Sequence, residues 1–301
     1  MRPTKVTGYY GRPVLKAPVW KSAIPLYFFT GGVAGASSTL AFAAGLRGNR
    51  RLARSAMLAS VAGVAASGPL LVIDLGKPSR FLNMLRVAKP TSPMSVGSWV
   101  LTAFAPASMA AAASDVTGRL PRLGRVAAGA GAVLGPVVAT YTAVLVANTA
   151  IPAWHDAHRE LPFLFVGSAA ASAAGIAMIA TPVADAGPAR RLAMMGAALE
   201  LGAFRAMESR LDEAVAGPYM HGRAGRLAKA AEACSATGAV LAVTAGRRRR
   251  RAAVTAGALL CAGSLLTRFS VFRAGIESAA DPAATIDPQR RRVDGRGTVG
   301  A

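Results

Sequence analysis

Long apolar blocks alternate with short polar connections along most of the chain. Five blocks contain no charged residue: 22–46, 55–73, 90–114, 126–154 and 161–184. A bilayer core of about 30 Å needs about 20 apolar residues in a helix, so each of the five can cross a membrane. Three weaker blocks are interrupted by charges: 190–210, 229–246 and 252–272. The pattern predicts an all-α, polytopic membrane protein with a bundle of eight transmembrane helices.

The same pattern divides the chain into three parts. We expect a polar N-terminal leader at residues 1–21, an eight-helix transmembrane domain at residues 22–278, and a disordered C-terminal tail at residues 279–301. Each block is continuously apolar and does not alternate with period two, which favours helices over a β-barrel. Small residues in the segments 31–35 and 129–135 are typical of helices that pack closely in lipid.

Composition adds a strong positive charge to this picture. The 301 residues carry a formal net charge of +21, although 53% are hydrophobic and only 16% are charged. The arginines cluster in the short connections and not on a soluble domain. Membrane topology explains such clusters better than phosphate or base recognition does, so we expect a membrane partner and no nucleic acid.

With eight spans, the connections fall on two faces of the membrane. Face A receives both termini and the longer connections, which follow spans two, four and six. Face B receives the four short turns, which hold fourteen arginines with only Asp115 and Asp185 as nearby acids. A high density of Lys and Arg in short loops marks the cytoplasmic side, which favours both termini outside. The total number of Lys and Arg points the other way.

The cysteines and histidines limit the redox chemistry available to this chain alone. Cys234 and Cys261 form no CxxC pattern and lie in predicted spans, where we interpret them as packing residues. All three histidines lie in connections on face A, so no pair stands at mid-depth to ligate a haem. We expect neither haem, nor an iron–sulfur cluster, nor another metal in this chain. Electron transfer would then need a diffusible cofactor such as a quinone.

Polar side chains in apolar spans are functional candidates because lipid penalises them. In the fourth span, Tyr141 and Asn148 are seven residues apart and share a helical face that points toward face A. Trp154 follows them, and we interpret it as a residue of the interfacial aromatic belt.

Two acids add to these candidates. Asp74 reaches face A from the second span, where it either belongs to a site, or acts as a cap or pairs with Lys77 or Arg80. Glu200 is the most isolated acid within a span, which favours a role in proton transfer.

Three segments together resemble the NrfD/PsrC family, the membrane subunits of polysulfide reductase and related complexes. They are YFFTGGVAGASS in the first span, DLGKPSRFLNMLRVAKPTSPMSVGSWVL between the second and third spans, and YTAVLVANTAIPAW in the fourth. The resemblance covers about residues 9–175.

The resemblance implies an eight-helix membrane subunit without haem that exchanges electrons with menaquinone or ubiquinone. It also implies two partners docked at face A: a ferredoxin-like iron–sulfur subunit and a molybdopterin-type catalytic subunit. Carried over by motif, Tyr141 is similar to the tyrosine that hydrogen-bonds a quinone carbonyl. Asp74 and Arg80 are similar to the polar residues at the rim of that pocket.

We therefore expect a quinone-interacting anchor of a respiratory oxidoreductase, not active alone, in the inner (cytoplasmic) cell membrane. The candidates for catalysis are Tyr141, Asp74 and Glu200. The candidates for quinone binding are Tyr141, Asn148, Asp74, Arg80 and His155. An alternative is a secondary transporter or proton-conducting subunit, in which Glu200 would lie on the translocation path. A purely structural anchor would leave Tyr141 and Asn148 without a role.

Overall fold

The computed structural model describes residues 14–16, 18–75, 77, 79–288 and 290. That part of the chain is helical and has no strand, which confirms the predicted all-α class. Six helices are long and apolar enough to cross a membrane: α1 (Ala23–Leu46), α2 (Arg50–Asp74), α4 (Pro93–Thr117), α5 (Pro121–Ala147), α7 (Leu161–Ala180) and α11 (Arg250–Ala280).

Two further helices match these in length but are less apolar: α8 (Gly187–Arg210) and α10 (Gly222–Val243). They correspond to the sixth and seventh predicted spans, whose charged residues lower their hydropathy. Six candidate spans are therefore present among the described residues, and the count of eight is not confirmed. Short helices lie in the connections: α3 (Arg80–Asn83), α6 (Pro152–His155), α9 (Glu213–Met220) and the 3-10 helix η2 (Ala245–Arg247).

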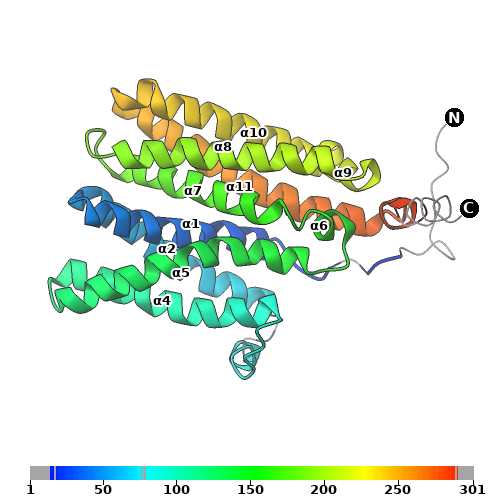
Figure 1. Ribbon diagram of the computed structural model, residues 1–301, viewed down its shortest axis with the longest axis horizontal. Coiled ribbons are helices and arrows are strands. Elements are labelled where there is room, and N and C mark those ends of the chain that lie inside the picture. The colour runs from blue at the N-terminus through cyan, green and yellow to red at the C-terminus, as the bar shows by residue number, and fades with distance from the viewer. Residues whose placement is uncertain (1–13, 17, 76, 78, 289, 291–301) are drawn as a thin grey trace, which may run out of the picture.

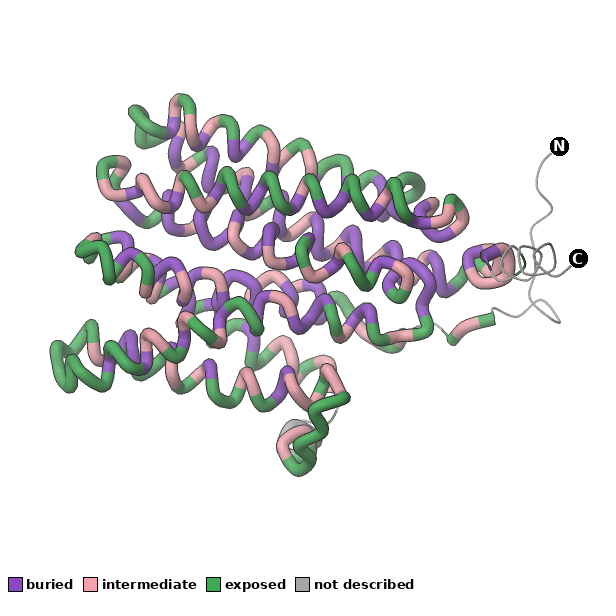
Figure 2. Tube along the Cα trace, viewed as in Figure 1, coloured by how far each residue is buried: buried purple, intermediate pink, exposed green. Residues whose placement is uncertain are grey.

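The long helices lie side by side and form an elongated bundle (Figure 1). The turns α1–α2, α4–α5, α7–α8 and α10–α11 gather at one end, which is face B, and α3, α6 and α9 lie toward the opposite end, face A. Helix α1 packs against α2, α5 and α7, and α7 packs against α8 and α11. Burial follows this order, because α1 and α7 are the most buried spans while α2 and α4 keep large exposed surfaces (Figure 2).

The predicted leader and tail lie largely outside the described residues. Helix α11 continues to Ala280, and residues 283–288 are also helical. Residues 1–13, 17 and 291–301 are not described, so the boundary of the leader and the disorder of the tail stay predictions. Gly76 and Pro78 of the motif that follows α2 are also outside the described part.

Glycines bring α1 and α5 into backbone contact. A Cβ atom placed on Gly35 would overlap the carbonyl oxygen of Gly135, and a Cβ on Gly135 would overlap the carbonyl oxygen of Gly35. No larger side chain fits at either position without moving a helix. The small residues predicted to pack closely therefore do so at this crossing.

Replacing Gly35 by Ala is expected to push α1 and α5 apart and to lower the free energy of unfolding by about 1–3 kcal/mol. Thermal unfolding in detergent measures the effect. Gly202 in α8 is the matched control, because the space around its Cβ position is open. Ala should be neutral or slightly stabilising there through its better helix propensity. Equal melting temperatures for Gly35→Ala and the unmodified protein would contradict the close contact.

Trp154 does not belong to an interfacial belt, so that interpretation was wrong. Its side chain is 0% exposed. The indole ring lies against Gly275 of α11, and its Nε1 donates a hydrogen bond to the carbonyl oxygen of Val271 at 2.7 Å. The ring of Trp20 stacks on it with centroids 5.6 Å apart. Helix α6 turns the connection back into the bundle, where a buried indole N–H needs an acceptor.

Candidate functional site

A cavity of about 470 Å³ lies between α1, α2, α4 and α5. Its lining extends from Trp20 to Ala34 around α1, which is about 20 Å at 1.5 Å per helical residue. Met84 and Leu85, from the connection between α2 and α4, also line it. The lining is mostly apolar with a few polar side chains. This shape suits an elongated, apolar ligand that carries a small number of hydrogen-bonding groups.

Tyr141 lines this cavity from α5. Its ring packs against Gly97 of α4 so closely that a Cβ atom on Gly97 would overlap the ring. The contact fixes the ring, which is 8% exposed. The Tyr141 hydroxyl makes no hydrogen bond to another described residue, so it is free to bind a ligand in the cavity.

Asp74 lines the same cavity at its face A end, where it is the last residue of α2. Its Oδ1 accepts a hydrogen bond from the backbone N–H of Lys21 at 3.2 Å. This bond joins the end of α2 to the segment that precedes α1. Asp74 forms no ion pair with Lys77 or Arg80, the two partners considered from the sequence. The structure thus brings Tyr141 and Asp74 to one cavity from two separate helices.

Tyr27 is a cavity residue that the sequence did not single out as a site residue. Its side chain is 1% exposed, and its buried hydroxyl has no hydrogen-bond partner among the described residues. One turn further along α1, Thr30 shares a hydrogen bond of 2.8 Å with the hydroxyl of Ser67, another lining residue. A phenol within the first apolar block was the available signal, but its position relative to the cavity depends on how α1 packs.

Arg80, Asn148 and His155 lie near face A but do not line the cavity. All three are exposed. Arg80 begins α3, and Asn148 is the C-cap of α5. The Nδ1 atom of His155 lies 3.3 Å from the carbonyl oxygen of Ala147. The sequence predicted that these three residues contact a quinone headgroup. Such a contact would require the α2–α4 connection to move or the bound ligand to extend beyond the cavity lining.

Glu200 belongs to a separate buried cluster. It is 3% exposed and accepts hydrogen bonds from Thr267 at 2.6 Å and from Ser235 at 2.9 Å. The neighbouring Arg268 is fully buried, lies 3.8 Å from the centroid of the Phe165 ring, and donates to the carbonyl oxygen of Phe165 at 2.7 Å. This carboxyl is not among the residues that line the cavity.

An ion pair joins the start of α7 to the end of α8. Arg210, at the end of α8, donates from Nε to Oε1 of Glu160 at 2.5 Å. Burial would raise the pKa of Glu160, but the hydrogen bond and charge of Arg210 outweigh it and hold that pKa below its usual value. The contribution of this ion pair to the stability of the folded protein is therefore present above the ordinary pKa of a glutamate. It is lost as the pH falls through the lowered pKa of Glu160.

Fold and cavity define a multi-pass membrane protein with a mostly apolar cavity between α1, α2, α4 and α5. The family model described as "Polysulphide reductase, NrfD" matches residues 14–205, which is more than half of the chain and includes every predicted site residue. The chain belongs to the NrfD family. Members are membrane subunits of polysulfide reductase-like oxidoreductases and partner with other oxidoreductase subunits. A comparison with curated proteins gave no match.

Proposed function

We propose that this chain is the quinone-interacting membrane anchor subunit of a respiratory oxidoreductase complex, of the kind used in anaerobic respiration. It would pass electrons between the membrane quinone pool and a partner iron–sulfur subunit. The observation that carries the proposal is the common cavity of Tyr141 and Asp74, whose lining is mostly apolar. Family membership supplies the oxidoreductase context.

Menaquinone or ubiquinone fits the residues that line this cavity. A bound quinone supplies reversible transfer of two electrons and two protons. Its ring carries two carbonyl oxygens, and the cavity offers two phenol hydroxyls that have no hydrogen-bond partner among the described residues, those of Tyr141 and Tyr27. Its isoprenoid tail matches the apolar walls, which include Leu71, Leu101 and Phe104.

Each polar residue has a distinct task in this proposal. Tyr141 donates a hydrogen bond from its hydroxyl and orients the headgroup against the wall formed by α4. Asp74 accepts a proton on its carboxylate near face A, where the proton can reach water. The Lys21 backbone N–H holds that carboxylate in place. The apolar lining excludes water from the rest of the cavity.

Face A is the proposed docking side for a ferredoxin-like iron–sulfur subunit and a molybdopterin-type catalytic subunit. The α2–α4 connection, which lines the cavity, exposes four cations that suit an acidic partner surface: Lys77, Arg80, Arg86 and Lys89. A short distance between the docked cluster and the cavity would then support electron transfer.

We also propose that α8 and α10 cross the membrane and complete eight spans, with face B in the cytoplasm of an inner-membrane protein. Helix α8 has 24 residues, or about 36 Å at 1.5 Å per residue. Its most isolated acid, Glu200, is buried and hydrogen-bonded within the protein. Average hydropathy therefore underestimates how well the helix suits lipid.

Purification of the native complex in mild detergent tests the proposed function. We expect co-purified iron–sulfur and molybdopterin subunits, and menaquinone or ubiquinone in a solvent extract. A complex that contains this chain but no redox-active partner would refute the proposal.

The Glu200 cluster favours a second function, the conduction of protons. Glu200→Gln keeps the size of the side chain; its amide oxygen can accept from one of the two hydroxyls of Ser235 and Thr267, and its NH2 group can donate to the other. If the carboxyl carries protons, proton uptake into proteoliposomes should fall at least about 100-fold with assembly unchanged. Ser235→Ala is the control that removes one hydrogen bond and keeps the carboxyl. Unchanged uptake by Glu200→Gln would exclude this route.

A further inference from the structure

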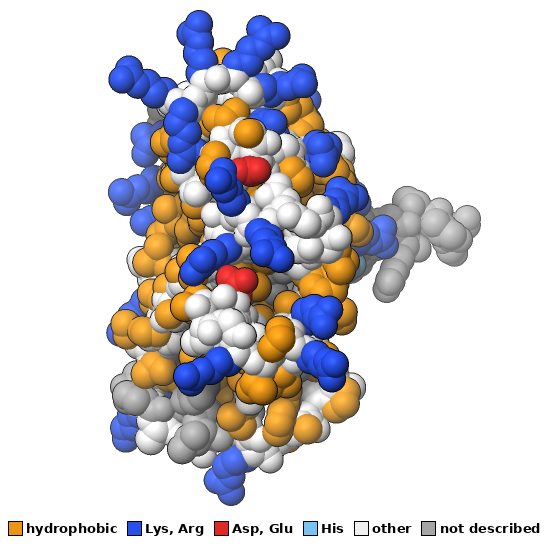
Figure 3. Space-filling model, turned by 90° about the vertical axis from the view of Figure 1, so that its left-hand side faces the viewer, with side chains coloured by type: hydrophobic (Ala, Val, Ile, Leu, Met, Phe, Trp, Pro, Cys, Tyr) orange, Lys and Arg blue, Asp and Glu red, His pale blue; other side chains and the backbone are white. Residues whose placement is uncertain are grey.

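Basic side chains are spread over face B, with few acidic side chains among them (Figure 3). The four turns and adjoining helix ends contain fourteen arginines: Arg47, Arg50, Arg51, Arg54, Arg119, Arg122, Arg125, Arg190, Arg191, Arg247, Arg248, Arg249, Arg250 and Arg251. Only two acids in the same region face them, Asp115 and Asp185. The balance of charge on this surface therefore requires anions from outside the chain.

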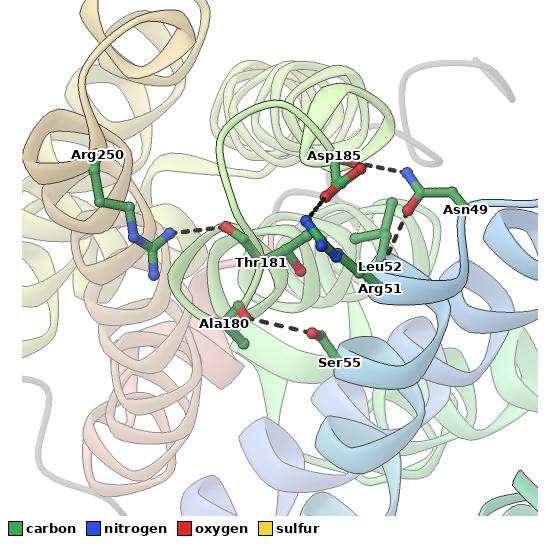
Figure 4. A network of polar contacts seen from close by, with 8 residues as sticks. All are labelled: Asn49, Arg51, Leu52, Ser55, Ala180, Thr181, Asp185 and Arg250. Atoms are coloured by element: carbon green, nitrogen blue, oxygen red, sulfur yellow. Dashed lines mark hydrogen bonds and ion pairs between the residues drawn. The ribbon is translucent and has the colours of Figure 1, made fainter.

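Four of the arginines have partners within the protein. Arg51 pairs with Asp185 at 3.3 Å, and Arg54 pairs with Asp115 at 3.7 Å. Arg190 donates to the carbonyl oxygen of Val183. Arg250 reaches from α11 to the end of α7 and donates to the carbonyl oxygens of Met178 and Thr181, both at 2.8 Å. These bonds hold the turns together, as Figure 4 shows for Arg51 and Arg250.

The side chains of the other ten make no hydrogen bond or ion pair with any residue that the structure describes. All ten side chains are exposed, and each of these residues lies in or close to a turn that contains at least one other arginine. The positive charges of neighbouring arginines repel one another, and this repulsion is relieved when an external anion binds between them.

The α4–α5 turn adds an apolar feature to this cationic surface. Leu120 has a φ of 51°, the only positive φ of a non-glycine residue in the described chain, and its side chain is 69% exposed. The turn is held by Ser114, whose hydroxyl donates to the carbonyl oxygen of Arg119 at 2.8 Å, and by Gly118 in the left-handed region. A left-handed backbone is unfavourable for leucine, yet here it displays an apolar side chain between Arg119 and Arg122.

Leu120 is not isolated on this surface. Leu123 and Val126, on the first turns of α5, are 57% and 70% exposed. Apolar side chains next to unpaired arginines at the end of membrane-spanning helices match the boundary between lipid headgroups and acyl chains, where the two environments meet. A soluble anion would satisfy the arginines but not the leucines.

We propose that face B is a binding surface for anionic phospholipids, with the α4–α5 turn as its centre. Arg119, Arg122 and Arg125 hold the lipid phosphates, and Leu120 inserts between the headgroups. The surface is at the opposite end of the bundle from the quinone cavity, so the inference does not depend on the proposed function.

Native mass spectrometry of the full-length protein in detergent, titrated with phosphatidylglycerol or phosphatidylcholine, tests the proposal. The triple variant Arg119→Gln/Arg122→Gln/Arg125→Gln should raise the apparent Kd for phosphatidylglycerol at least about fivefold and leave phosphatidylcholine unaffected. The charge-matched control is Arg159→Gln/Arg223→Gln/Arg226→Gln, which changes exposed arginines toward face A. An equal loss in the control, or no loss in the first variant, would overturn the proposal.

The variant Leu120→Gly tests the lipid contact of this side chain without disturbing the fold of the turn. Glycine adopts a φ of 51° readily, so the melting temperature in detergent should stay the same or rise. Phosphatidylglycerol binding should nevertheless weaken at least about twofold. Full retention of lipid binding by Leu120→Gly would refute the insertion of this side chain.

Discussion

Replacing Tyr141 by Phe is expected to reduce quinone-linked turnover at least about 100-fold while the complex assembles normally. The substitution removes only the hydroxyl. The ring can keep its contact with Gly97, so the shape of the cavity should be preserved. Steady-state turnover with a water-soluble quinone analogue, in the complex with its partner subunits, measures the effect. Size-exclusion chromatography and thermal unfolding report on assembly.

Tyr219→Phe is the matched control for this experiment. Tyr219 is also buried, but its hydroxyl donates to the carbonyl oxygen of Ala153 at 2.9 Å and it does not line the cavity. Its loss should lower the free energy of unfolding by about 1 kcal/mol and leave turnover intact. Normal turnover in Tyr141→Phe, or an equal loss in both variants, would remove Tyr141 from the site.

Replacing Gly97 by Ala is expected to reduce turnover by about 100-fold through the position of Tyr141. The new Cβ would overlap the Tyr141 ring, so the ring must shift within the cavity. A displacement of about 1 Å at a binding group can lower a rate by that factor. Turnover and quinone affinity should both change, because the headgroup loses its orientation. Measurements of kcat and KM over a range of quinone concentrations separate the two effects.

A double-mutant cycle links the two substitutions. If Gly97 acts only by placing the Tyr141 hydroxyl, Gly97→Ala should add little to the loss already caused by Tyr141→Phe. Fully additive losses would show that Gly97 acts independently of the hydroxyl. Gly202→Ala, at a position with open space, controls for the effect of adding a methyl group to a helical glycine.

The sequence was sufficient for the fold class because lipid restricts the backbone to few solutions. Uncharged blocks of helical length must form helices, since their peptide groups have no water to bond. The common cavity of Tyr141 and Asp74 was also within reach, because both spans deliver these residues to the same end. The exact number of spans was harder to predict because α8 and α10 carry charges whose burial depends on neighbouring helices.

Other features depend on tertiary contacts that no local pattern records. The burial of Trp154 requires the small surface of Gly275, which is 121 positions away in a different helix. The proximity of Gly97 to Tyr141 likewise depends on how α4 crosses α5. Tyr27 resembles any aromatic residue of an apolar helix until its unpaired hydroxyl is seen beside the cavity. Each case is set by the distance between two helices, which sequence periodicity does not specify.

The buried arginine of α11 also constrains how the protein is made. An arginine at the centre of a helix costs about 2.5–3.5 kcal/mol on scales of membrane insertion. The groups that compensate Arg268 are the Phe165 carbonyl and ring on α7, with Glu200 nearby on α8. Both helices are synthesised before α11. The last span is therefore expected to leave the translocon only once the earlier helices have assembled, so its integration would act as a checkpoint for completion of the bundle.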